Sequence, residues 1–247
     1  MISEFPLFAF TTLAGLSGGA YVAAAVFGGA DAGEKKRAWL LPLVCLVLLG
    51  LGLLGCLGHL GRPLMFMNAL ANPTSMIAEE AYWSIAFGVV VLVDVILCAT
   101  KGASPRVLRI VGAAFACVLM AVMANAYFTS HAVAAWTNLA TWPLYIVGDL
   151  AMGFALYGAL DAAAGKSAVP VAVLGALFAL TCVAEAVVFS GAEQDAALFI
   201  AGAILAAVGA VVSMLSRKKA FAAPVAFALI FIAVALARYG FYAASVL

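Results

Sequence analysis

The sequence has very little charge. Of its 247 residues, 9% are Asp, Glu, Lys or Arg, whereas 68% are hydrophobic and the mean hydropathy is +1.21. A soluble domain carries about 25% charged residues, which cover its surface. The outside of this fold must therefore itself be apolar, with lipid as its solvent. This composition predicts an integral membrane protein and excludes a soluble enzyme.

Histidine and paired cysteines are scarce as well. The two histidines, His59 and His131, fall near the ends of apolar segments, and the five cysteines lie inside apolar runs with no CxxC pair. A haem between helices normally takes two intramembrane histidines, and an iron–sulfur cluster needs grouped cysteines. We therefore expect no cofactor and no metal to be bound by this chain.

Long apolar runs dominate what is present. About 20 apolar residues cross a bilayer core, which predicts an all-α protein with one transmembrane domain over residues 1–247. The expected spans of this eight-helix bundle are Pro6–Gly29, Ala38–Gly58, Glu80–Thr100, Val107–Tyr127, Trp142–Ala164, Ala168–Ser190, Ala196–Leu215 and Phe221–Leu247. The segment Pro63–Ala78 is too polar and too short to span, and we expect it to be re-entrant or interfacial.

The basic residues lie mainly on one side of these spans. Ten of the 12 are expected there: Lys35, Lys36, Arg37, Lys101, Arg106, Arg109, Lys166, Arg217, Lys218 and Lys219. By the positive-inside rule this side is cytoplasmic, so both termini are predicted to face outward. Trp83, Trp136, Trp142 and Tyr127 fall at the predicted outer boundary, where an aromatic belt is expected.

Several ionisable residues fall within the outer half of the predicted bilayer. They are His59, Glu79, Glu80, Asp149, Glu185 and Arg238. Charges inside a span are costly and mark either a buried pair or a functional site. One interpretation is structural, with Arg238 neutralising Asp149 or Glu185. Asp94 lies nearer the inner surface, where we expect it to pair with a base.

A histidine with carboxylates can accept the protons that a hydroquinone loses on oxidation, because the histidine pKa lies near neutrality. An apolar cleft between helices would hold the ring and its isoprenoid tail. The electrons must then leave through another subunit, docked on the outer face.

Three short motifs follow the second predicted span: His59-Leu60-Gly61-Arg62-Pro63, Asn68-Ala69-Leu70 and Glu79-Glu80. They resemble the anchor subunit of dimethyl sulfoxide reductase-type molybdoenzymes, as does Arg238 followed by aromatic residues. The resemblance implies a haem-free anchor in the cytoplasmic membrane that oxidises menaquinol. It also implies an iron–sulfur subunit and a molybdopterin catalytic subunit as partners outside.

The same resemblance implies that His59 is the quinol-site histidine and that Glu80, ahead of its neighbour Glu79, is the acidic partner. The residues that we expect to contribute to quinol binding are Arg62, Pro63, Asn68, Asp149, Glu185 and Arg238; Asp149 and Glu185 are included for their depth alone.

Three other functions fit the sequence: a polysulfide-reductase-type quinone-linked anchor, a secondary transporter and a purely structural anchor. A transporter would place its substrate site near the bilayer midplane on broken helices. The outward bias of the polar residues counts against that function.

Overall fold

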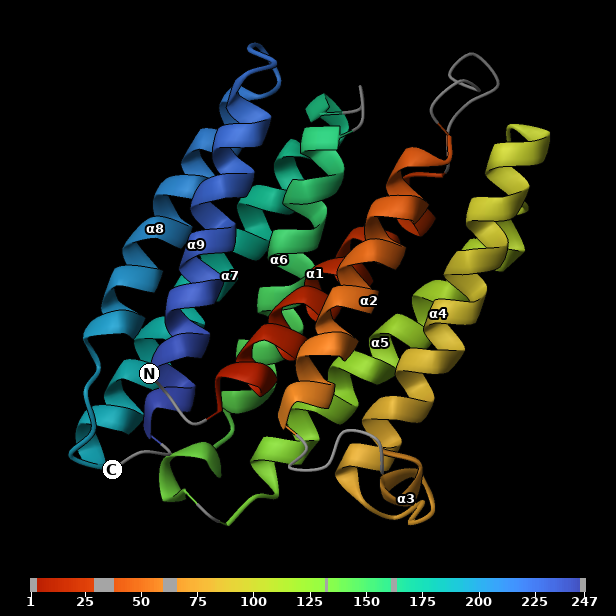
Figure 1. Ribbon diagram of the computed structural model, residues 1–247. Helices are drawn as coiled ribbons and strands as arrows, with labels where there is room; N and C mark the ends of the chain where they lie inside the picture. The colour runs from red at the N-terminus through yellow and green to blue at the C-terminus, as the bar shows by residue number, and fades with distance from the viewer. Residues whose placement is uncertain (1–3, 29–37, 60–65, 132, 161–163, 245–247) are drawn as a thin grey trace.

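The computed structural model describes residues 4–28, 38–59, 66–131, 133–160 and 164–244, and these residues contain no strand. The elements in chain order are α1 (Phe5–Phe27), α2 (Leu40–His59), α3 (Phe66–Leu70), α4 (Met76–Lys101), α5 (Arg106–Phe128), the 3-10 turn η3 (Ala134–Trp136), α6 (Thr141–Leu160), α7 (Ala164–Gly191), α8 (Ala197–Leu215) and α9 (Ala222–Ala243). The long helices run side by side as a bundle (Figure 1).

Eight of these helices, α1, α2 and α4 to α9, are long and apolar enough to cross a membrane. The predicted all-α class and the eight spans are thus confirmed. Large apolar side chains cover the outside of the bundle, among them Leu54, Val107, Leu180 and Val211, each at least 65% exposed. Such a surface suits lipid rather than water.

Helices α1 and α6 form the centre of the bundle, and most of their residues are buried. Small residues allow them to approach closely. A Cβ atom on Gly19 would overlap the backbone of Asp149, and one on Gly153 would overlap the backbone of Gly19. This contact fixes Asp149 against α1 in the interior of the protein.

The two ends of the bundle differ in charge. The end of α9, α3 and η3 lie towards the bottom of Figure 1, whereas the α4–α5 and α8–α9 connections lie at the top. Six basic side chains at the top are exposed: Lys101, Arg106, Lys166, Arg217, Lys218 and Lys219. The bundle therefore has one strongly basic end, as the sequence predicted. That this end faces the cytoplasm stays a prediction.

The start of α4 differs from the prediction. The helix begins at Met76, four residues before the expected Glu80, because the Ser75 side chain accepts a hydrogen bond from the Ala78 backbone N–H at 3.2 Å. Such an N-cap satisfies a donor that the first helical turn leaves free. Glu79 and Glu80 therefore lie within the first turns of α4, and the segment expected to precede the span contains the short helix α3.

Candidate functional site

Two buried charges in the half of the bundle away from its basic end pair with each other. Arg238 of α9 donates a hydrogen bond to Asp149 of α6, and both side chains are fully buried. The guanidinium carbon of Arg238 also lies 4.6 Å from the centre of the Tyr145 ring. The structural interpretation is thus confirmed for Asp149, whereas Glu185 makes no ion pair among the described residues.

Glu185 of α7 is hydrogen-bonded by a side chain from the segment that precedes α6. Asn138 donates a hydrogen bond from Nδ2 to Glu185 Oε2 at 3.1 Å, and the same amide donates to the Ala135 carbonyl oxygen at 2.8 Å. Glu185 is fully buried, and its Oε1 has no hydrogen-bond partner within the described part of the chain. This carboxyl group is therefore separate from the Arg238–Asp149 pair.

Aromatic side chains fill the space at this end of the bundle. The rings of Tyr127 and Tyr145 stack with centroids 5.2 Å apart, and Tyr145 donates its hydroxyl to that of Tyr242 at 2.9 Å. Trp136 donates its indole N–H to the Phe241 carbonyl oxygen at 2.7 Å. The prediction that Tyr127 and Trp136 belong to an aromatic belt is therefore wrong. Both side chains are buried, and they pack α5, α6 and α9 together.

Glu80 of α4 is a further buried carboxyl group. Its side chain is 5% exposed, and its Oε1 has no hydrogen-bond partner among the residues described. The Glu80 carboxyl group lies within electrostatic range of Tyr127, Tyr145 and Cys56. The neighbouring Glu79 is only half-buried. The helix thus turns one glutamate inward and the other towards its edge.

The predicted partners of Glu80 lie on the adjoining segment. Helix α2 ends at His59, but the His59 side chain and all of Arg62 and Pro63 lie outside the described residues. Asn68 is exposed on α3. Helix α3 is tied to α4 by a hydrogen bond from the Tyr82 hydroxyl to the Leu70 carbonyl oxygen.

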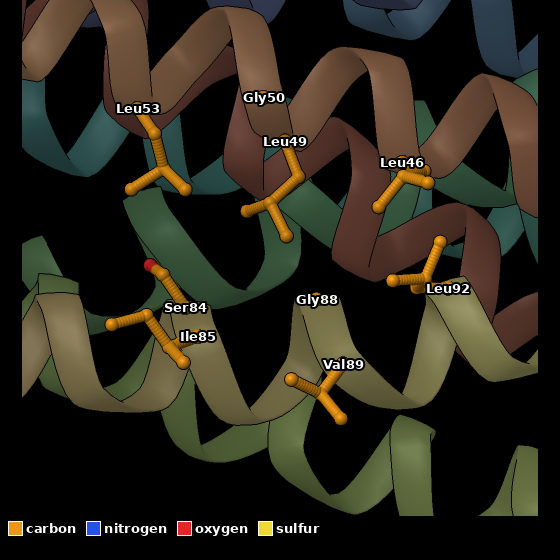
Figure 2. Close-up of a pocket in the computed structure, with 9 residues that line it drawn as sticks. All are labelled: Leu46, Leu49, Gly50, Leu53, Ser84, Ile85, Gly88, Val89 and Leu92. Carbon is orange, nitrogen blue, oxygen red and sulfur yellow. The ribbon is translucent and has the colours of Figure 1, made fainter.

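An apolar groove runs between α2 and α4 and encloses about 300 Å³. Figure 2 shows Leu46, Leu49, Gly50 and Leu53 of α2 on one wall and Ser84, Ile85, Gly88, Val89 and Leu92 of α4 on the other. Ser84 is the one polar side chain in this lining. It lies one helical turn from Glu80, on the same face of α4.

A second polar cluster lies in the half of the bundle nearer the basic end. Asp94 Oδ2 accepts a hydrogen bond from the Tyr21 hydroxyl at 2.9 Å and pairs with Arg109 Nε at 3.2 Å. Cys98 donates to Asp94 Oδ1 at 3.2 Å. The prediction that Asp94 pairs with a base from this side is confirmed, and the base is Arg109 of α5.

The structure therefore joins Asp149 with Arg238 and places Glu80 and Glu185 at separate positions around the aromatic cluster. Sequence reasoning missed Tyr145, Thr11 and Ser84. Thr11 contacts the Tyr242 hydroxyl at 3.1 Å. Ser84 had a signal, because it follows Glu80 by four residues. No group of three or more His, Cys, Asp or Glu side chains in the described part could hold a metal ion.

Comparison with known proteins adds one finding. The model of the family described as the DMSO reductase anchor subunit (DmsC) matches residues 1–242, nearly the whole chain. No curated protein matches the sequence.

Proposed function

Because the chain belongs to the DMSO reductase anchor subunit family, we propose that it oxidises menaquinol near the outer surface of the cytoplasmic membrane. Both termini face outward in this proposal. The electrons pass to an iron–sulfur subunit docked on the outer face, and from there to a molybdopterin catalytic subunit. The chain itself holds no cofactor, and the quinol is its substrate.

The observation that carries the proposal is the Glu80 carboxyl group. It is buried, has an oxygen without a hydrogen-bond partner among the described residues, and lies one turn beyond the outer end of an apolar groove. A buried polar atom without a partner is costly in a protein that only needs to fold. A bound quinol hydroxyl would supply that partner.

Oxidation of the quinol requires two proton acceptors. Oxidation of one quinol to the quinone releases two protons and two electrons. His59 accepts one proton and Glu80 the other, and both lose them to outside water. The two electrons leave for the iron–sulfur subunit. General acid–base groups of this kind contribute about 10²- to 10⁴-fold to a rate.

The remaining residues take supporting roles in this proposal. Arg62, Pro63 and Asn68 belong to the segment between α2 and α4, and we propose that they contribute to quinol binding. Asp149 and Arg238 form a buried pair behind the aromatic cluster and position it. Glu185 is held by Asn138 at the same end of the bundle and contributes to quinol binding.

The test is to replace His59 with Ala in the complete complex. Menaquinol oxidation should be lost, while electron transfer from an artificial dye to the terminal acceptor should continue. Dyes reduce the iron–sulfur subunit without entering the membrane site. Full menaquinol turnover in His59→Ala would contradict the proposal.

A further inference from the structure

The groove between α2 and α4 opens towards lipid, and its composition changes along its length. From Leu46 to Leu53 it extends over about 10 Å of helix, at 1.5 Å per residue. Its walls there are Leu, Ile, Val and Gly. At the outer end stands Ser84, and Glu80 follows one turn further out. The groove is thus apolar towards the membrane centre and polar towards the outer surface.

Ser84 points to a ligand. Its side chain is fully buried, yet its hydroxyl oxygen has no hydrogen-bond partner in the described part of the chain. Figure 2 shows this hydroxyl directed across the groove towards Leu53 of α2. Serine hydroxyls in helices ordinarily bond a carbonyl oxygen one turn earlier, as Thr181 does with Leu177 at 3.0 Å. Ser84 instead presents its hydroxyl to the groove.

Gly50 keeps the groove open from the other side. A Cβ atom on Gly50 would meet nothing within 4 Å, and one on Gly88, across the groove, would meet only the end of the Leu49 side chain, at 3.2 Å. Most of the other helical glycines in this bundle lie against a neighbouring helix. Gly50 lies against empty space, so its lack of a side chain widens the groove and serves no helix contact.

We infer that this groove is the lateral entrance and tail site of the quinol, with the Ser84 hydroxyl donating a hydrogen bond to the ring oxygen whose proton passes to Glu80. The inference rests on the proposed function. Glu80 and Ser84 lie one turn apart on the same face of α4, so both side chains can reach one ring oxygen. The second ring oxygen stays free for the other proton acceptor of the proposed function, and the first isoprene units lie along the leucines of α2.

The volume agrees with this occupant. Sites for small organic ligands enclose about 300 Å³ or more and are mostly apolar with a few placed polar groups. A phospholipid would also place an acyl chain in an apolar groove. However, its charged headgroup would have to lie beside Glu80 in a buried position, where a neutral quinol ring is more easily accommodated.

The experiment compares a quinol that has an isoprenoid tail with menadiol, the same ring without a tail. Gly50→Leu and Val89→Phe fill the groove from its two walls, in the complete complex. Each should raise the KM for menaquinol about tenfold relative to that for menadiol, which corresponds to about 1.4 kcal/mol. Val47→Leu is the matched control on α2, because Val47 is 50% exposed and outside the groove. Its two KM values should stay at the wild-type level.

Ser84→Ala supplies the second measurement. It should raise the KM for both quinols, because the bond goes to the ring and not to the tail. Dye-driven activity reports assembly for every variant. If Gly50→Leu fails to assemble, Val89→Phe alone carries the groove test, since Val89 is 55% exposed.

Unchanged menaquinol KM in both assembled groove variants would overturn the inference, even if His59→Ala is inactive and the proposed function stands. A change in the phospholipid retained by the purified complex, with unchanged quinol kinetics, would also overturn it. Loss of turnover with both quinols in His59→Ala would support the proposed function. A tail-dependent rise in KM in the groove variants would, in addition, support this inference.

Discussion

Arg238 and Asp149 are 89 positions apart in the sequence, yet they form an ion pair in which both side chains are fully buried. Such a pair contributes little net stability, because desolvating two charges is costly, but removing one partner leaves an uncompensated charge. The pair therefore constrains how α6 and α9 assemble around the aromatic cluster.

Arg238→Leu should lower the amount of anchor in the membrane, with a loss of about 3–5 kcal/mol expected for a broken buried pair. The measurement is the yield of the subunit in membranes and its midpoint of thermal unfolding in detergent. The double variant Arg238→Leu with Asp149→Leu should recover part of the loss, since no charge is then left alone. Normal yield of Arg238→Leu with quinol oxidation abolished would instead make Arg238 a catalytic residue.

Gly15→Ala should destabilise the contact between α1 and α6. The added Cβ would overlap the Asp149 carboxyl group, which is already held by Arg238. Overpacking a core typically costs about 1–3 kcal/mol, which thermal unfolding of the purified subunit would measure. Gly50→Ala is the control, because its Cβ would meet nothing within 4 Å. Equal unfolding temperatures for the two variants would contradict the packing described.

The sequence predicted the eight spans well because hydropathy depends on composition alone. It could not predict how each helix is rotated. Tyr127 and Trp136 were expected at a lipid boundary, but they are buried, since contacts with Tyr145 and Phe241 fix their orientation. For the same reason the sequence left open whether Arg238 would pair with Asp149 or Glu185. Which acid lies within reach of the arginine depends on how α6, α7 and α9 pack.

The start of α4 was missed for a local reason, and the motif alone could not show which of the two glutamates is buried. Polar residues before Glu80 lowered the hydropathy, so the N-cap at Ser75 went unnoticed. Once the helix begins at Met76, its periodicity turns Glu80 inward and Glu79 towards the edge. The motifs predict where along the chain the proposed site lies, whereas burial distinguishes its two carboxyl groups.

The orientation of the bundle can be tested by cysteine labelling of a chain whose five native cysteines are replaced. Single cysteines at Ser130 and Gly191 should react with a membrane-impermeant maleimide on intact cells. Those at Gly102 and Lys218 should react only after the cells are permeabilised, because basic loops remain cytoplasmic. The reverse pattern would place the proposed quinol site on the wrong side for an outer partner subunit.

Asp94→Asn should leave quinol oxidation per assembled complex unchanged. Asp94 lies with Tyr21, Cys98 and Arg109 in the half nearer the basic end, away from Glu80. We expect protons to leave only on the outer side, so that turnover in liposomes generates no membrane potential of its own. Proton uptake from the inner side that disappears in Asp94→Asn would reveal a route through this cluster.

The central claim is that the buried Glu80 accepts a proton from the quinol, and one pair of variants tests it most directly. Glu80→Gln and Glu79→Gln make the same chemical change at adjacent positions, one buried and one half-buried. The rate of menaquinol oxidation by the complete complex should fall about a hundredfold or more in Glu80→Gln. It should stay close to the wild-type rate in Glu79→Gln, with dye-driven activity retained in both. A wild-type rate in Glu80→Gln, or an equal loss in the two variants, would contradict the account.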